Sequence, residues 1–271
     1  MKYMGNKSRI ANHILPIILE NKKEYDWYVE PFCGSLGIMD KVTGIKKIAN
    51  DYNPFLIAMW YGLQHNFYKP LEIPFGLYDE YRTKYNILKK RDKTFERVRK
   101  CLGVSIQLEN NDSDLTDMSA EKYNELNEYF LIGWVGWVAS FNGRFFDGGY
   151  SGKTKTRDYV SEQIKNILNQ VNLIGDIIFH SYDYHELYIP KKSIIYCDPP
   201  YKNSKKYDIS KDFDYEKFYN WCRNISKRKD CKIFISEYEM PDDFECIWKM
   251  EVTNSMATKN TYKPIEKLFT L

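Results

Sequence analysis

A short apolar run that ends in a rigid polar turn constrains this chain more than any other feature. Residues 193–197 read Ser-Ile-Ile-Tyr-Cys, and Asp198-Pro199-Pro200-Tyr201 follow directly. The run indicates a buried strand. Each proline fixes φ at about −65° and has no N–H to donate. The motif therefore places one carboxylate, two stiffened carbonyls and one aromatic face together at the end of a buried strand.

This set of groups suits a flat substrate that carries an exocyclic amine. The amine can donate to the Asp198 carboxylate and to a proline carbonyl, while Tyr201 stacks on the ring. A turn that merely ends a strand is the simpler interpretation, because Pro-Pro commonly marks a loop. The remaining motifs decide between the two.

A second motif lies upstream, where residues 27–37 read as a strand, a glycine turn and then a helix with Ser35 as its N-cap. The next predicted strand ends at Asp51, 17 residues after Gly34. In dinucleotide-binding folds, an acidic residue about 20 residues beyond the glycines binds ribose hydroxyls. The three-glycine pyrophosphate fingerprint is absent, so a nucleoside ligand without phosphates fits better than NAD.

Strand and helix patterns alternate at both ends of the chain. We expect strands at 27–32, 46–50, 176–180, 193–197, 231–236, 246–252 and 265–270, and helices at 8–20, 35–42, 54–64, 158–172 and 214–228. This alternation favours an α/β fold with a mostly parallel sheet covered on both faces. The last two strands are joined without a helical pattern, so they should form an antiparallel hairpin at the sheet edge.

The distance between the two motifs predicts an inserted domain. Two strand–helix units need roughly 60–80 residues, and far more separate Gly34 from Asp198. The excess falls at 65–150, where helices are expected at 95–102 and 119–132. We therefore predict a catalytic domain made of residues 1–64 and 151–271, and a mainly helical insertion at 65–150.

Basic residues concentrate in this insertion, although the whole chain has a formal net charge of only +3. Residues 79–100 hold nine Lys and Arg against four Asp and Glu. A solvated helix face would explain the run. A basic segment beside a catalytic domain is also the usual footprint of a phosphate-backbone interface, which makes Lys89, Lys90 and Arg91 candidate DNA contacts.

The loop at 142–157 is a second candidate DNA contact. It combines glycines and positive charge with nearby aromatic residues, including Phe145 and Phe146. A disordered connection is the simpler interpretation. We expect instead that the loop reads DNA, with Asn142 and Arg144 nearest the bases.

Six segments together carry a family resemblance. They are 2–7 (Lys-Tyr-Met-Gly-Asn-Lys), 30–34 (Glu-Pro-Phe-Cys-Gly), 50–53 (Asn-Asp-Tyr-Asn), 141–144 (Phe-Asn-Gly-Arg), 198–201 (Asp-Pro-Pro-Tyr) and 265–268 (Ile-Glu-Lys-Leu). In this order, and over almost the whole chain, the set resembles Dam-type DNA adenine-N6 methyltransferases. The resemblance implies a Rossmann-like seven-stranded sheet with one reversed strand, and a target-recognition domain at 65–150.

The resemblance also implies a reaction and a set of site residues. S-adenosylmethionine would supply a methyl group to N6 of an adenine that has flipped out of double-stranded DNA. The catalytic residues would be Asp198, Pro199, Pro200 and Tyr201. The cofactor would be bound by Tyr3, Lys7, Glu30, Phe32, Gly34, Asp51 and Asp183. For Asp183, a helix N-cap role is equally compatible with the sequence.

Other functions remain open from the residues alone. A cytosine-N4 methyltransferase uses similar amine chemistry, although Asp rather than Ser before Pro-Pro-Tyr favours adenine by resemblance. A glutamine or RNA methyltransferase would share the core but not explain the basic insertion. A catalytically silent DNA-binding subunit is a further alternative. A DNA methyltransferase could also have a companion restriction enzyme as a partner.

Composition narrows the setting. The six cysteines form no Cys-x-x-Cys pair and the four histidines form no ligand cluster, so we expect no metal site and a reducing, cytoplasmic location. The first residues lack an apolar signal segment. The longest apolar stretch, 131–141, is far shorter than the ~20 residues of a membrane span, so no membrane partner is expected.

Overall fold

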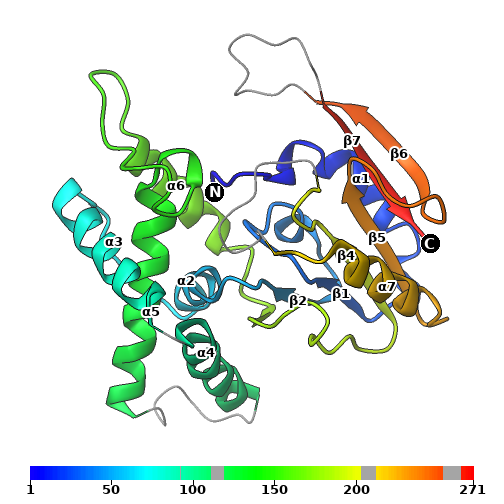
Figure 1. The fold of residues 1–271 in the computed structure, drawn as a ribbon, viewed down its shortest axis with the longest axis horizontal. Helices are drawn as coiled ribbons and strands as arrows, with labels where there is room; N and C mark the ends of the chain where they lie inside the picture. The colour runs from blue at the N-terminus through cyan, green and yellow to red at the C-terminus, as the bar shows by residue number, and fades with distance from the viewer. Residues whose placement is uncertain (92, 111–118, 203–211, 253–263) are drawn as a thin grey trace.

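One mixed sheet forms the centre of the protein (Figure 1). The computed structural model describes residues 1–91, 93–110, 119–202, 212–252 and 264–271, and only the backbone of 104–110. Within these residues the strand order is β3-β2-β1-β4-β5-β7-β6. The strands are β1 (Trp27–Glu30), β2 (Lys46–Asn50), β3 (Ile177–His180), β4 (Ser193–Cys197), β5 (Cys231–Glu237), β6 (Glu245–Glu251) and β7 (Ile265–Thr270).

The direction of the strands confirms the predicted mostly parallel sheet. Strands β1 to β5 pair in parallel with one another. Strand β7 runs antiparallel to both β5 and β6, so β6 and β7 form the predicted hairpin at one edge. The connection at 253–263 lies outside the described residues.

Alternating side chains give the sheet two apolar faces, because successive strand residues point to opposite sides. Tyr28 belongs to the larger core, which also includes residues of α1 (Ala11–Ile18), α2 (Pro54–Gln64) and α6 (Tyr159–Val171). Its neighbour Val29 belongs to a second core with α7 (Tyr215–Ser226) on the other face. Both faces are therefore covered by helices, as the alternation of patterns predicted.

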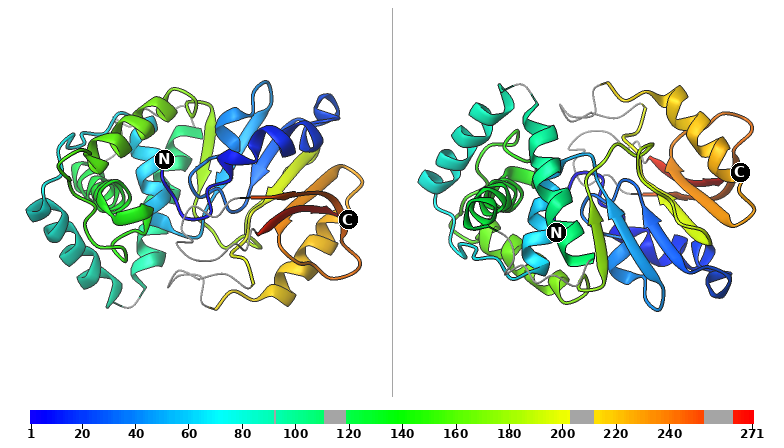
Figure 2. Two further views of the ribbon diagram at one scale, coloured as in Figure 1. Left: turned by 90° about the horizontal axis from the view of Figure 1, so that it is seen from above. Right: turned by 90° about the horizontal axis from the view of Figure 1, so that it is seen from below.

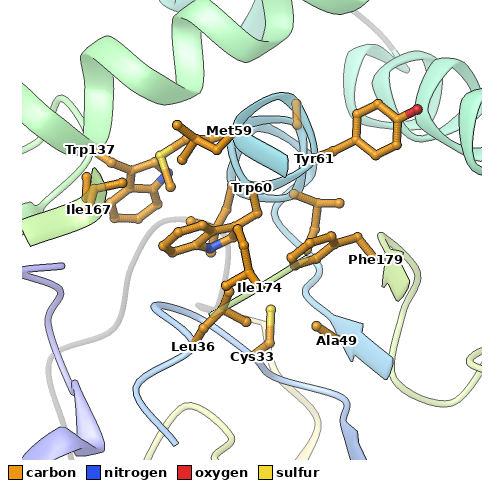
Figure 3. Packing of buried hydrophobic residues seen from close by; sticks show 14 of the residues in the cluster. Cys33, Leu36, Ala49, Met59, Trp60, Tyr61, Trp137, Ile167, Ile174 and Phe179 are labelled. Atoms are coloured by element: carbon orange, nitrogen blue, oxygen red, sulfur yellow. The ribbon is translucent and has the colours of Figure 1, made fainter. Parts of the chain in front are cut away.

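A helical layer stands beside the sheet and includes α3 (Phe75–Lys89), α4 (Thr94–Asn110) and α5 (Ala120–Ala139). The views from above and below place these helices on one side of the sheet and the β6–β7 hairpin on the other (Figure 2). Their buried side chains join the same apolar core as the sheet, and α2 lies between them and the sheet (Figure 3). The layer is thus packed onto the sheet through α2.

Three helix predictions need correction. No α-helix forms at 35–42: only the short 3-10 turn η3 (Met39–Lys41) is present, and Ser35 caps no helix. The reason is a left-handed turn, with φ of +46° at Gly34 and +57° at Leu36. The helix expected at 8–20 is split into η1 (Lys7–Arg9) and α1, and the one at 95–102 extends over 94–110.

No helix is predicted for residues 79–94 of the basic segment, yet α3 occupies 75–89. Two further 3-10 turns are η2 (Lys22–Glu24) and η5 (Phe141–Gly143). None of the described helices is long and apolar enough to cross a membrane.

Candidate active site

Asp198 follows β4, which lies between β1 and β5 near the middle of the sheet. Its Oδ1 lies 3.3 Å from Nζ of Lys7, on the N-terminal segment. Burial raises the pKa of Asp198 to about 6, because the nearby Lys7 ammonium does not fully offset the loss of hydration and Glu266 adds a like charge. The carboxylate is therefore ionised above about pH 6 and held in one place.

Tyr201 lies beside this ion pair. Its hydroxyl donates a 2.7 Å hydrogen bond to Oε2 of Glu266 on β7, and the Lys7 ammonium lies 4.3 Å from its ring centroid. Tyr238 contacts the ring edge-on, with centroids 4.6 Å apart. Burial raises the pKa of Tyr201 far above its ordinary value, so the hydroxyl stays protonated as a donor. The sequence thus anticipated the aromatic face but not the carboxylate that fixes it.

Two further contacts hold the backbone of this turn. The Tyr215 hydroxyl donates to the Pro200 carbonyl oxygen at 2.9 Å. Glu237, at the end of β5, accepts the backbone N–H of Lys202 at 2.7 Å. Burial raises the pKa of Glu237 to about 7. No sequence pattern identified Tyr215 or Glu237. Each reaches the motif only because β5 pairs with β4 and α7 packs on β5.

The glycine turn and Asp51 are in direct contact. Oδ2 of Asp51 accepts the backbone N–H of Gly34 at 3.1 Å, and Oδ1 accepts that of Asn53 at 2.9 Å. Burial raises the pKa of Asp51 to about 6, although both hydrogen bonds favour the ionised form. Strands β1 and β2 are parallel neighbours, so their carboxyl ends, and the groups that follow them, share one edge.

Tyr3 and Trp60 enclose the glycine turn from two sides. A side chain at Gly34 would come within 3.1 Å of the Tyr3 ring. The indole N–H of Trp60 donates to the Gly34 carbonyl oxygen at 3.0 Å, and Trp60 points from α2 toward Leu36 in the turn (Figure 3). The N-terminal segment and α2 therefore both set the shape of this turn.

Asn50 is a positioning residue that the sequence left without a role. Its amide nitrogen donates to the carbonyls of Pro31 and Tyr182, at 2.9 and 3.1 Å, and its oxygen accepts the Tyr182 N–H at 2.8 Å. It therefore ties together the segments after β1, β2 and β3. A buried Asn at a strand end, directly before the acidic residue, is the signal that could have identified it.

The other predicted cofactor residues surround this edge of the sheet. Glu30 is 3% exposed and accepts from the Tyr28 hydroxyl at 3.0 Å; burial raises the pKa of Glu30 well above its ordinary value. Phe32 packs against Tyr184, with ring centroids 5.4 Å apart. Asp183 is one-third exposed and its Oδ1 lies 2.6 Å from Nδ1 of His185. Asp183 caps no α-helix, since none begins directly after it: residues 184–192 are turns and coil.

Lys7 is placed differently from the expectation. The prediction puts it at the methionine carboxylate of the cofactor, whereas its ammonium contacts Asp198 and Glu266, the latter at 3.6 Å. Burial alone would lower the pKa of Lys7, but the two carboxylates reverse the effect and the pKa is raised. Lys7 is therefore a buried cation beside the predicted catalytic motif at 198–201.

The predicted DNA contacts fall in two places on the helical layer. Lys89, Lys90 and Arg91 are exposed at the C-terminal end of α3. Asn142, with φ of +55°, lies in the turn η5 and lines a surface pocket together with Lys2, and Arg144 directly follows this turn. Among the described residues, no group of three or more His, Cys, Asp or Glu side chains could hold a metal ion.

Two aromatic residues of this loop pack against α3. Phe145 and Phe146 are 5% and 7% exposed, and both pack on Tyr85 of α3, with centroids 4.9 and 5.5 Å apart. They anchor the loop to α3 and are not available to stack on bases. Phe141, 49% exposed, is the aromatic residue of this turn that faces solvent.

Arg99 links α4 to the segment after β2. Its guanidinium lies 3.9 Å from the Tyr52 ring centroid and donates to the Tyr52 carbonyl oxygen at 2.8 Å. Its charge also lowers the pKa of the adjacent Asp51, against the larger effect of burial. At least one residue of the basic segment at 79–100 therefore contacts the edge of the sheet where β2 ends.

The chain matches a protein family and is similar to solved structures. The family model for D12 class N6 adenine-specific DNA methyltransferases matches residues 3–267. No curated protein matches the chain. Among solved structures, the chain is similar to SMU.472, described as a putative methyltransferase complexed with SAH, at 13% identity and a TM-score of 0.37. The match covers 98% of this chain and 52% of that one, so this chain spans about half the length of that protein.

Proposed function

Because this chain belongs to the D12 class N6 adenine-specific DNA methyltransferase family, we propose that it transfers a methyl group from S-adenosylmethionine to N6 of adenine in a specific sequence of double-stranded DNA. The observation that carries the proposal is the arrangement at one sheet edge. Asp198 and its proline turn stand at the end of β4, and the neighbouring strand β1 leads into the turn where Gly34 donates to Asp51. An amine-binding group and a nucleoside-binding group thus share an edge.

The groups on this edge fit the cofactor. Asp51 is a fixed carboxylate suited to the two ribose hydroxyls, and Tyr3, Glu30, Phe32 and Gly34 surround the adjoining turn. We assign Asp183 to the cofactor adenine amine. Lys7 would meet the methionine carboxylate, for which it would leave one of its present carboxylate partners. When bound, S-adenosylmethionine supplies an electrophilic methyl group on a sulfonium.

The residues of the motif would act by positioning the target amine. A base within a duplex cannot reach the pocket, so the adenine must flip out. Asp198 accepts one N6 hydrogen and the Pro199 carbonyl accepts the other, which draws the nitrogen lone pair out of conjugation with the ring. Fixed dipoles of this kind stabilise the transition state without reorganising. Asp198 does not remove the proton before attack, because a neutral aromatic amine is far too weak an acid.

Tyr201 would stack on the flipped base, and Pro200 would shape the pocket. Base–aromatic stacking contributes about 1–3 kcal/mol per base. The contacts of Tyr201 with Glu266, Lys7 and Tyr238 support this role, because they fix the ring before the base arrives.

We propose that the insertion at 65–150 is the domain that recognises the target DNA sequence. Asn142 and Arg144 would read bases beside the pocket lined by Lys2, and Lys89, Lys90 and Arg91 would contact phosphates. A side-chain fork such as that of Arg reads guanine in the major groove. The burial of Phe145 and Phe146 supports a loop held rigidly for readout.

Tritiated methyl transfer to unmethylated mixed-sequence DNA, followed by nucleoside analysis, tests the function. Label in N6-methyladenine is the expected result. Label in N4-methylcytosine would select the alternative chemistry, and no label with intact DNA binding would select a silent DNA-binding subunit. Methylation-sensitive sequencing of DNA from expressing cells would then identify the target sequence, whether or not a restriction enzyme accompanies it.

A further inference from the structure

We propose that Glu266 is a positioning residue for the reaction, which acts on Tyr201 through a hydrogen bond and on Asp198 through Lys7. The proposal rests on the proposed function for its kinetic part alone. Glu266 lies on β7, the reversed strand, far along the chain from the motif it serves. It is 8% exposed. A buried carboxylate is costly unless its partners hold it in place, so its contacts indicate its purpose.

Both contacts of Glu266 lead into the motif. Its Oε2 accepts the Tyr201 hydroxyl at 2.7 Å and lies 3.6 Å from Nζ of Lys7. The same ammonium lies 3.3 Å from Oδ1 of Asp198. One side chain therefore fixes the aromatic ring and shares a cation with the catalytic carboxylate.

The shared cation makes Glu266 and Asp198 competitors. Two carboxylates beside one ammonium repel each other, so the charge of Glu266 makes Asp198 harder to ionise than it would be with Lys7 alone. Other charges also face Asp198. Around it lie Lys7, Glu30 at the end of β1, Glu237 at the end of β5, Glu266 on β7 and the phenols of Tyr196 and Tyr201. Of these, Glu266 is the one that contacts both Lys7 and Tyr201.

Replacing Glu266 by glutamine separates the two effects. Glutamine keeps the shape and can still accept the Tyr201 hydroxyl, but it removes the negative charge. Lys7 is then left to Asp198, so Asp198 should ionise at lower pH than in the wild type. The weaker hydrogen bond should loosen Tyr201, and kcat/KM for DNA should fall by about tenfold, the scale by which a hydrogen bond to a charged group exceeds one to a neutral group.

A titration measures the charge effect without relying on catalysis. Carboxyl resonances of ¹³C-aspartate are followed with pH in the wild type, Glu266→Gln and the control Glu245→Gln, a matched change at an exposed position of β6. Asp198→Asn identifies the resonance. We expect the Asp198 midpoint to fall in Glu266→Gln and to stay in place in the control. An unchanged midpoint in a folded Glu266→Gln protein would overturn the proposal.

A double-mutant cycle measures the effect through Tyr201. Single-turnover methyl transfer is compared in the wild type, Glu266→Gln, Tyr201→Phe and the double variant. If Glu266 acts on the ring through the hydroxyl, Glu266→Gln should lower the methyl-transfer rate much less when Tyr201 is already phenylalanine. In Glu266→Gln, the acid limb of the pH–rate profile should also move to lower pH. If the rate losses of the two single variants simply multiply in the double variant, and the acid limb of the pH–rate profile does not move, Glu266 has only a structural role. Absence of methyl transfer by the wild type would defeat the proposed function and leave the titration to decide this inference.

Discussion

Replacing Asp198 by asparagine should change activity and stability in opposite directions. The substitution keeps the size of the side chain but removes the charge that pairs with Lys7 at 3.3 Å. If this carboxylate holds the target amine in the transition state, its loss should lower kcat by about 10²–10³, the scale for one preorganised electrostatic group. Asp198→Ala should lose at least as much, and cofactor binding should change little in either variant.

The stability effect follows from the pKa of Asp198. Burial raises it to about 6, from an ordinary value of 3.8. A carboxyl whose pKa is higher in the folded state binds its proton more tightly there. Its contribution to stability is therefore complete below about pH 4 and is lost as the pH rises through about 6. The difference corresponds to a cost on the order of 1–3 kcal/mol for the ionised form at pH 8.

Asparagine resembles the neutral carboxyl and avoids this cost. At pH 8 the variant should be as stable as the wild type or more stable, and the advantage should shrink toward pH 5. Urea unfolding from pH 5 to 8 and single-turnover methyl transfer on the same preparations measure both effects. Asp242→Asn, at an exposed position, is the matched control. A folded variant with full activity would refute the mechanism, and a loss of stability at pH 8 would refute the electrostatic reasoning.

Three further predictions concern the cofactor, the DNA and the helical layer. Asp51→Ala should weaken cofactor binding by about 1–3 kcal/mol; unchanged affinity in calorimetry would remove this residue from the site. Arg144→Ala should relax target choice by about 1–3 kcal/mol at one base pair, whereas Lys90→Ala should only flatten the salt dependence of binding by about one slope unit; unaltered methylation patterns in Arg144→Ala would contradict this division. Gly133→Ala should lower the free energy of unfolding by about 1–3 kcal/mol, because its methyl group would collide with the Phe55 carbonyl oxygen where α5 crosses α2; wild-type stability in urea unfolding would show that the crossing is looser.

The local patterns of the sequence predicted the sheet well. Short apolar runs bounded by turn residues located all seven described strands to within two residues, including the hairpin of β6 and β7. Such runs identify strands because the local sequence alone fixes their apolar composition and their bounding turns. Helices at 54–64, 158–172 and 214–228 were equally clear, since a proline or aspartate marks each start.

The left-handed turn at Gly34 and Leu36 shows where local patterns fail. Residues 35–42 have a helical composition, but the turn must bring the Gly34 N–H to Asp51 and its carbonyl to Trp60. These contacts come from β2 and α2, so no property of residues 35–42 alone could reveal them. The burial of Phe145 and Phe146 likewise depends on a distant element, because α3 supplies the surface that buries them.

By itself, the sequence determined the order of the strands along the chain, the acidic and aromatic groups of the motif at 198–201, and the pairing of a glycine turn with an acid 17 residues later. Tertiary structure alone decided that Lys7 and Glu266, from opposite ends of the chain, meet beside Asp198 and Tyr201. The physical reason is that spacing along a chain encodes the period of strands and helices, whereas charges pair across whichever surfaces the packing of the sheet brings within a few ångströms.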